Sequence, residues 1–157
     1  MRIFITADHH FNHKNIIEYC KRPFKSVEEM NNIMIEKWNK KVNKEDLVIH
    51  LGDFALGNKQ QVNDIRKKLN GTIILIKGNH DKVNKGFLIV RDSLQIGNLI
   101  FTHRPIPKAD ISKGCVNVHG HIHEKDSLHG INVSVEKTDY EPILLEELEN
   151  KILDKRK

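Results

Sequence analysis

Short apolar runs rich in isoleucine and valine recur along this sequence, and they constrain its fold more than any other feature. Each run has the length of a β-strand, and β-branched residues fit the pleated, buried surface of a sheet. A chain with so many short strands must assemble at least one sheet. The runs lie at residues 3–6, 47–51, 72–76, 99–102, 116–118 and 131–135.

Helices are predicted between the first three of these strands. Ser26 can cap the first helix, with Glu29 three residues further on, and apolar residues then recur at helical spacing. The second helix is predicted to begin near Asn58 and to end at residues 70–71, where asparagine and glycine stop helices. The order is therefore strand, helix, strand, helix, strand.

From Phe87 onward the pattern changes to closely spaced strands. A hairpin turn is predicted at residues 96–98 and a final amphipathic helix at about residues 142–153. Together these elements predict a layered α/β sandwich. The chain has 157 residues without an internal repeat or a low-complexity linker, so we expect a single domain over residues 1–157.

The composition excludes several classes of protein. Hydrophobic residues make up 38% and charged residues 30%, which is typical of a globular protein rather than a disordered one. No segment approaches the ~20 apolar residues of a membrane span, and the N-terminus lacks the pattern of a signal peptide. Cys20 and Cys115 lie outside any CxxC pattern, so no disulfide framework is expected. We therefore expect a cytoplasmic protein with no membrane partner.

The charge balance favours an anionic partner. The net charge is +5 and the pI is about 9.2, which suits a phosphoester or a nucleic acid. Aromatic residues that would stack on bases are not interleaved with the basic ones, so nucleic acid is not specifically indicated. The sequence does not determine the oligomeric state.

Polar clusters directly follow five of the predicted strands. Loops that leave the carboxyl ends of strands in an α/β sheet gather at one edge, so these side chains should converge. One such residue alone would be a cap or a turn residue, but five clusters together favour a metal site. Their carboxylate, amide and imidazole groups suit Mn²⁺, Fe, Zn²⁺ or Ni²⁺ better than Ca²⁺. The clusters are Asp8 and His10; Gly52 and Asp53; Asn79, His80 and Asp81; His103; and His119, Gly120, His121 and His123.

The segments ADHH, LGDF, KGNHD, FTHRP and HGHIH resemble, in this order, the motifs of the calcineurin-like metallophosphoesterases. The resemblance runs from about Asp8 to His123 and is specific because several motifs keep the order of the family. It implies a double β-sheet sandwich flanked by helices, in a small member of the bacterial and phage type. It also implies two divalent metal ions, with Mn²⁺ preferred. Asp8, His10 and His123 resemble the ligands of one ion, Asn79, His103 and His121 those of the other, and Asp53 the bridging carboxylate.

The resemblance also implies a mechanism. His80 resembles the catalytic histidine that protonates the leaving group, and Asp81 is expected to orient or support its ring. A metal-bound hydroxide would be the nucleophile, and no GxSxG or Cys/His arrangement offers another one. A small member without large insertions should have an open site, which favours phosphodiesters as substrates. A nucleotide or protein phosphatase is the alternative, and an inactive metal-binding scaffold is a third hypothesis.

For seven further residues the sequence allows both a functional and a structural role. Alternation along the first strand points His9 away from the ligands, and a position within the second strand favours a structural role for His50. Each of the other five could either contact the substrate or have a role in turns, loop packing or surface charge. These residues are His13, His119, His129, Arg22 and Arg104.

Overall fold

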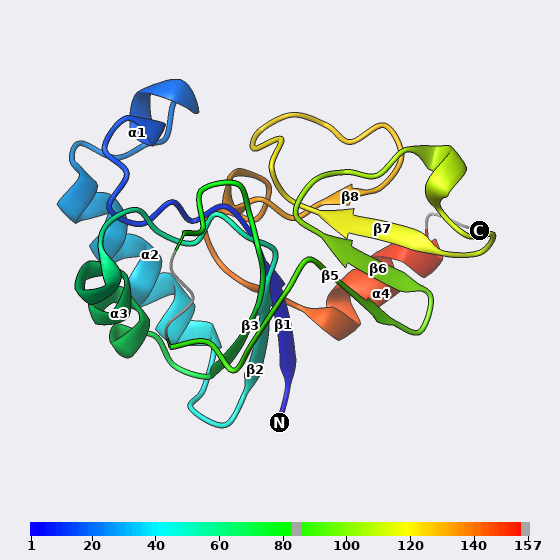
Figure 1. Ribbon diagram of the computed structural model, residues 1–157, viewed down its shortest axis with the longest axis horizontal. Helices are drawn as coiled ribbons and strands as arrows, with labels where there is room; N and C mark the ends of the chain where they lie inside the picture. The colour runs from blue at the N-terminus through cyan, green and yellow to red at the C-terminus, as the bar shows by residue number, and fades with distance from the viewer. Residues whose placement is uncertain (83–85, 155–157) are drawn as a thin grey trace.

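The protein is an α/β sandwich of two β-sheets with flanking helices, as the sequence predicts (Figure 1). The computed structural model describes residues 1–82 and 86–154. The larger sheet has the order β4-β3-β2-β1-β9, in which β1 to β4 are parallel and β9 is antiparallel to β1. Its strands are β1 (Ile3–Thr6), β2 (Leu47–His50), β3 (Thr72–Ile76), β4 (Ile89–Arg91) and β9 (Ile143–Leu144).

The smaller sheet has the order β5-β6-β7-β8. β5 and β6 form the predicted antiparallel hairpin, whereas β6, β7 and β8 are parallel. The carboxyl end of β7 therefore points the same way as that of β6, and Figure 1 shows β7 directed toward the larger sheet. The strands are β5 (Ser93–Ile96), β6 (Leu99–Thr102), β7 (Val116–His119) and β8 (Ile131–Asn132).

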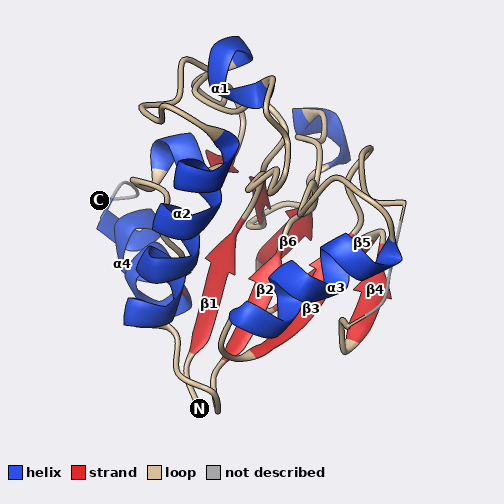
Figure 2. Ribbon diagram, turned by 90° about the vertical axis from the view of Figure 1, so that its left-hand side faces the viewer, coloured by secondary structure: helices blue, strands red, loops and turns tan. Residues whose placement is uncertain are grey.

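Two capped helices cover the outer face of the larger sheet (Figure 2). The Ser26 hydroxyl accepts a hydrogen bond from the Glu29 amide at 3.1 Å, and Asn58 and Gln61 form a reciprocal capping box. No helix in the described ranges is long and apolar enough to cross a membrane. The helices are α1 (Ile16–Tyr19), α2 (Val27–Lys41), α3 (Lys59–Lys68) and α4 (Leu145–Asp154), with 3-10 turns η1 (Lys108–Asp110) and η2 (Val135–Lys137).

The larger sheet is buried on both faces, which explains its nearly continuous apolar strands. Phe4 and Val48 face one core, which includes Trp38 of α2. Ile5 and Ile49 face a second core, which lies between the sheets and includes apolar residues of β6, β7 and α4. The alternation within β1 and β2 thus supplies both cores at once.

The structure corrects the predicted bounds in the last third of the chain. The strand expected at residues 131–135 ends at Asn132, and Val135 begins η2. The last helix begins at Leu145, because residues 143–144 pair with β1 as β9 and cover its otherwise open edge. β4 falls within the closely spaced strands predicted from Phe87 onward, whereas β9 and the single turn of α1 were not predicted.

Candidate metal centre

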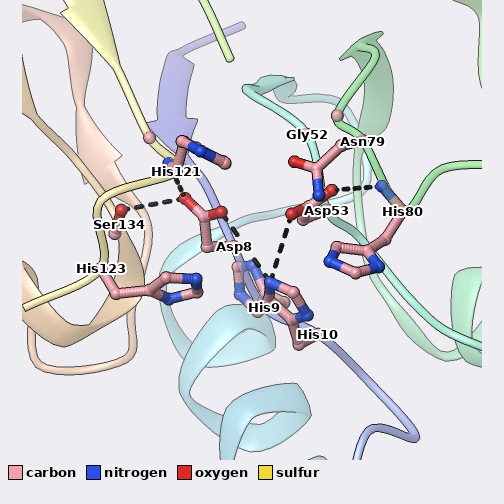
Figure 3. A network of polar contacts seen from close by, with 12 residues as sticks. Asp8, His9, His10, Gly52, Asp53, Asn79, His80, His121, His123 and Ser134 are labelled. Atoms are coloured by element: carbon pink, nitrogen blue, oxygen red, sulfur yellow. Dashed lines mark hydrogen bonds and ion pairs between the residues drawn. The ribbon is translucent and has the colours of Figure 1, made fainter. Parts of the chain in front are cut away.

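Loops that leave strands of both sheets meet at one place and bring the predicted ligands together (Figure 3). The amide of Asp8 donates to the carbonyl of Gly52, and the amide of His10 donates to that of Asp53, both at 3.0 Å. The loop after β7 joins them through the amide of His121, which donates to the Asp8 carboxylate at 2.8 Å. Residues from the first and last motifs are therefore neighbours.

Asp8, His10 and His123 form the first group of potential ligands, with one candidate atom of each within 4.8 Å of the others. Asp8 Oδ2 accepts hydrogen bonds from the His121 amide and the Ser134 hydroxyl. Asp8 Oδ1 lies 3.9 Å from His10 Nε2, and both atoms are buried without a hydrogen-bond partner among the described residues. Such unpaired polar atoms are costly to bury. A cation between them would satisfy both, so this group fits a metal ion.

Asp53, His103 and His121 form the second group. The carbonyl of Leu51 lies 2.7 Å from His103 Nδ1, so that nitrogen carries a proton and Nε2 is the potential ligand atom. His103 Nε2 lies 2.9 Å from Asn79 Oδ1, 3.2 Å from His121 Nδ1 and 3.4 Å from Asp53 Oδ2. Electron-rich atoms therefore crowd one point, which also fits a cation.

Asp53 lies between the two groups. Its Oδ2 is 3.4 Å from His10 Nε2 and 3.4 Å from His103 Nε2, while its Oδ1 accepts the amide proton of His80 at 2.8 Å. Burial opposes ionisation of this carboxyl, but the contacts with His10 and His103 hold its pKa well below the usual range. Asp53 thus presents a negative charge to both groups at neutral pH.

Burial sets the charge of several of these side chains. It lowers the pKa values of His10 and His121 to about 4 each, so both rings are neutral at pH 7. It also raises the pKa of Asp8 to about 6, against the opposing charges of His103 and His123. Neutral imidazoles and carboxylates are the forms that bind metals, so His10 and His121 are in the binding form at neutral pH. Burial opposes protonation of His103, but its contact with Asp53 raises the pKa of that ring, so a cation must compete with a proton there.

The backbone at this site is strained. Five of the seven predicted ligands have positive φ angles, between 51° and 71°, which are uncommon for residues other than glycine. Gly52 has φ +97°, and a Cβ there would come within 2.6 Å of Gly78 N and of His103 Nδ1. The surrounding fold must hold these conformations. The five ligands are Asp8, His10, Asp53, His121 and His123.

His80 lies at the mouth of the site. Its side chain is exposed, and its ring centroid is 5.3 Å from that of His10 and 6.1 Å from that of His13. His13 Nδ1 lies 3.0 Å from His10 Nδ1, so His13 supports a predicted ligand from the side of the ring that faces away from Asp8. Of the two roles considered for His13, this position favours one at the mouth of the site over one in a turn.

Asp81 has a different position from the one expected. Its Oδ2 accepts the amide protons of Asp53 at 2.7 Å and Gly78 at 2.8 Å, and its Oδ1 accepts that of Phe54 at 2.9 Å. Among the described residues, the Asp81 carboxylate forms these three hydrogen bonds and none to the ring of His80. Asp81 therefore fixes the two loops that carry Asp53 and Asn79, in place of the expected support of the His80 ring.

His9 and His50 form a buried pair in the core, in agreement with their predicted structural roles. The Gly52 amide donates to His50 Nδ1 at 3.2 Å, so His50 carries its proton on Nε2 and donates it to His9 Nδ1 at 3.0 Å. The His9 ring also stacks on Phe11. Both rings are neutral, because burial lowers the pKa of His50 to about 3 and that of His9 well below its usual value.

This pair predicts a specific loss of stability in acid. The folded pKa of His50 is below its unfolded value of 6.5, so its contribution is present above pH 6.5 and is lost between pH 6.5 and about 3. At pH 4 the loss is about 3 kcal/mol, at roughly 1.4 kcal/mol per pH unit. His50→Asn keeps hydrogen-bonding groups but does not titrate, so its free energy of unfolding should fall less steeply with pH.

Urea unfolding from pH 7 to 4, with chelator present throughout, measures this difference. The exposed His129→Asn is the matched control and should keep the pH slope of the parent. Equal slopes for the parent and His50→Asn would contradict the assignment.

The remaining histidines lie outside the metal centre. His119 is buried, with Nε2 2.7 Å from the Ser127 hydroxyl and Nδ1 2.9 Å from the Gly120 carbonyl, so it packs the loop after β7. His129 lines a hollow of about 450 Å³ beside β7, β8 and α4 that contains none of the predicted ligands. Loop packing or exposure is therefore the better reading for both.

Arg104 and Arg22 have different environments. Arg104 is exposed and lines a hollow of about 410 Å³ together with Lys77, Asn79 and His103. Arg22 is buried and contacts Glu136, so it is neither a surface charge nor a free ligand for phosphate. Both sequence readings of Arg22 were wrong, because no local pattern shows that a distant carboxylate covers it.

Glu136 is the main residue of this site that the sequence did not reveal. Its Oε1 lies 3.0 Å from His123 Nδ1 and accepts hydrogen bonds from Arg22 Nε at 2.9 Å and Nη2 at 2.7 Å. Burial opposes protonation of the His123 ring, but its contacts with Cys20 and Glu136 raise the pKa of His123 to about 10. A lone glutamate in a polar segment has no spacing that would identify it as part of a metal centre.

Comparisons with known proteins agree with this arrangement. The family model for calcineurin-like phosphoesterases matches residues 1–156. An uncharacterized protein of Methanocaldococcus jannaschii is 36% identical over 167 residues, which cover 99% of this chain and 93% of that protein. The crystal structure of a protein of unknown function from Aquifex aeolicus matches with a TM-score of 0.74 and 26% identity, over 95% of this chain and 98% of the other.

Proposed function

Because this chain belongs to the calcineurin-like phosphoesterase family, whose members hydrolyse phosphoesters with bound divalent metal ions, we propose that it is a phosphodiesterase with a binuclear metal centre. The observation that carries the proposal is the pair of adjoining ligand groups that share Asp53. We also propose that residues 1–157 form one domain and act in the cytoplasm, where the two free cysteines would stay reduced.

Seven residues would hold the two ions. We assign Asp8, His10 and His123 to the first position and Asn79, His103 and His121 to the second, with Asp53 between them. The buried unpaired Asp8 Oδ1 and His10 Nε2 support the first position. When bound, two divalent ions stabilise phosphoryl charge and lower the pKa of water, and Mn²⁺ is our preferred ion among Mn²⁺, Fe, Zn²⁺ and Ni²⁺.

We assign the role of general acid to His80. Its amide donates to Asp53, which fixes the residue beside the centre, while its side chain remains exposed to a substrate. Protonation of the leaving oxygen is the step that an exposed imidazole at this place can perform. Asp81 acts indirectly, since its three backbone hydrogen bonds hold the loops of Asp53 and Asn79.

Two hollows, one lined by Asn79 and the other by the adjacent His80, favour a diester over a monoester. One, of about 410 Å³, is lined by Lys77, Asn79 and Arg104, and the other, of about 220 Å³, by His80 and Lys82. A phosphodiester has a substituent on each side of the phosphorus and could occupy both. Exposed cations at their walls suit an anionic substrate.

The test measures kcat/KM for bis-p-nitrophenyl phosphate and p-nitrophenyl phosphate, with metal-free protein and after addition of each metal ion. We expect negligible turnover after chelation and recovery of turnover with Mn²⁺. We also expect kcat/KM to be at least about tenfold higher for the diester, which is the smallest effect typical of a substrate that lacks one group in contact with the enzyme. A monoester preference would promote the phosphatase alternative. Full turnover at negligible metal content would refute the metal-dependent function, and no turnover with any metal would favour an inactive scaffold.

A further inference from the structure

We propose that Glu136, held by Arg22, positions His123 for metal binding, so that this buried ion pair sets the affinity of the first metal position and not of the second. The inference rests on the binuclear centre of the proposed function. It assigns a role in that centre to two residues that lie outside the family motifs.

Glu136 determines which nitrogen of the His123 ring can bind a metal ion. Glu136 Oε1 lies 3.0 Å from His123 Nδ1, and a carboxylate can only accept a hydrogen bond. In the neutral ring that a metal requires, the proton therefore stays on Nδ1 and Nε2 is the free ligand atom. Figure 3 shows the His123 ring directed toward Asp8 and His10. A carboxylate behind a ligating histidine fixes its orientation and increases its basicity.

The guanidinium of Arg22 holds Glu136 in place. Its side chain is fully buried, and that of Glu136 is 4% exposed. Arg22 donates two hydrogen bonds to Glu136 Oε1, one to the carbonyl of Asp8 at 2.6 Å and one to the carbonyl of His9 at 2.7 Å. The planar donor groups of arginine suit such a fixed set of contacts. One cation therefore connects Glu136 to the strained segment that carries Asp8 and His10.

Arg22 and Glu136 support the first metal position and not the second. Arg22 and Glu136 connect to all three ligands of the first position, through the His123 ring and the segment of Asp8 and His10. The second position depends on other supports, such as the Leu51 carbonyl behind His103. Loss of the Glu136 charge should therefore weaken one ion and leave the other unchanged.

An alternative role for Glu136 is as a direct ligand, since it also forms a cluster of potential ligands with Cys20 and His123. Glu136 Oε2 is buried without a hydrogen-bond partner among the described residues, as a ligand atom would be, but the positive guanidinium of Arg22 on Glu136 Oε1 opposes a cation there. A metal ion bound by this cluster would also replace the hydrogen bond between His123 Nδ1 and the Glu136 carboxylate. The geometry therefore favours a supporting role.

The experiment is a Mn²⁺ titration of the chelated protein by calorimetry, with the absorption spectrum of bound Co²⁺ as a second reading. We expect the parent to bind two ions and Glu136→Gln to bind one of them about 10- to 100-fold more weakly, as for other residues behind a ligating histidine. Asp46→Asn is the matched control, because Asp46 is an equally buried carboxylate paired with Arg2 at the far end of β1. It should bind both ions like the parent.

Two further variants separate positioning from a general effect on the fold. Arg22→Gln with Glu136→Gln removes both buried charges together and should show the same selective loss while remaining folded by circular dichroism. In a His123→Ala background, Glu136→Gln should lose most of its effect on metal affinity, because the ring that it positions is absent and only the link through Arg22 to the segment of Asp8 and His10 remains. Additive losses in this cycle would indicate a merely structural role and overturn the inference.

The outcomes distinguish the inference from the proposed function. Two ions in the parent and unchanged affinities in Glu136→Gln would overturn the inference and leave the binuclear centre intact. A single ion in the parent would refute the binuclear centre. In that case, weaker binding of this ion by Glu136→Gln would still support the inference, and unchanged binding would overturn it.

Discussion

Replacement of Asp53 by asparagine should weaken binding of both metal ions by about 10²- to 10³-fold and abolish most of the activity. The carboxylate contacts both ligand groups, with Oδ2 3.4 Å from His10 Nε2 and from His103 Nε2. Two unit charges about 4 Å apart interact with about 4 kcal/mol at an effective dielectric constant of 20, which corresponds to about 10³-fold in affinity. Asparagine retains one oxygen donor but loses the charge that both ions share.

Metal stoichiometry measured by calorimetry and by metal analysis of the dialysed protein checks this expectation. Asp92→Asn is the matched control, because Asp92 is an exposed carboxylate in the hollow beside Asn79 and His103. It should bind two ions like the parent. If Asp53→Asn loses only one ion, Asp53 belongs to a single position and is not the bridge.

Replacement of His80 by glutamine should slow hydrolysis by roughly 10²- to 10⁴-fold if proton donation is its main contribution. Metal binding should change little, because the backbone amide of residue 80 still donates to Asp53. The loss should depend on the leaving group. A nitrophenolate departs without a proton, whereas a nucleoside alkoxide needs protonation as the bond breaks.

The measurement compares kcat for bis-p-nitrophenyl phosphate and for a dinucleoside diester, in the parent and in the variant, under conditions where chemistry limits both rates. His13→Gln is the matched control, because His13 is a second histidine at the site mouth whose ring lies against His10. Any loss in that variant should be similar for both substrates. Equal losses in His80→Gln, or a lost metal ion, would contradict its assignment as the acid.

Local signals in the sequence were sufficient for most of the secondary structure. β1 and β3 have the predicted bounds, because a buried strand in this sheet is a continuous apolar run. α2 begins after Ser26 as predicted, because the cap depends on residues three apart in the chain. β9 was not predicted, because a strand of two residues depends entirely on the partner strand that it meets.

The sequence by itself also determined the family, because its polar motifs directly follow strands and keep a fixed order. Loops after parallel strands gather at one edge whatever the details of packing, so convergence of these residues followed from their positions. Side-chain partners across the chain could not be inferred in this way. Asp81 belongs to the GNHD motif, yet its carboxylate binds the backbone amides of Asp53, Phe54 and Gly78.

Only the tertiary structure decided which residues support the centre. Arg22 and Glu136 are 114 positions apart, and their contact depends on where η2 lies relative to the segment between α1 and α2. The left-handed backbone of Asp8 and His10 likewise has no local signal, since neither is a glycine. Both features depend on long-range contacts, through which the packed fold holds strained ligands and buried charges in place, whereas sequence patterns report only what neighbouring residues require of one another.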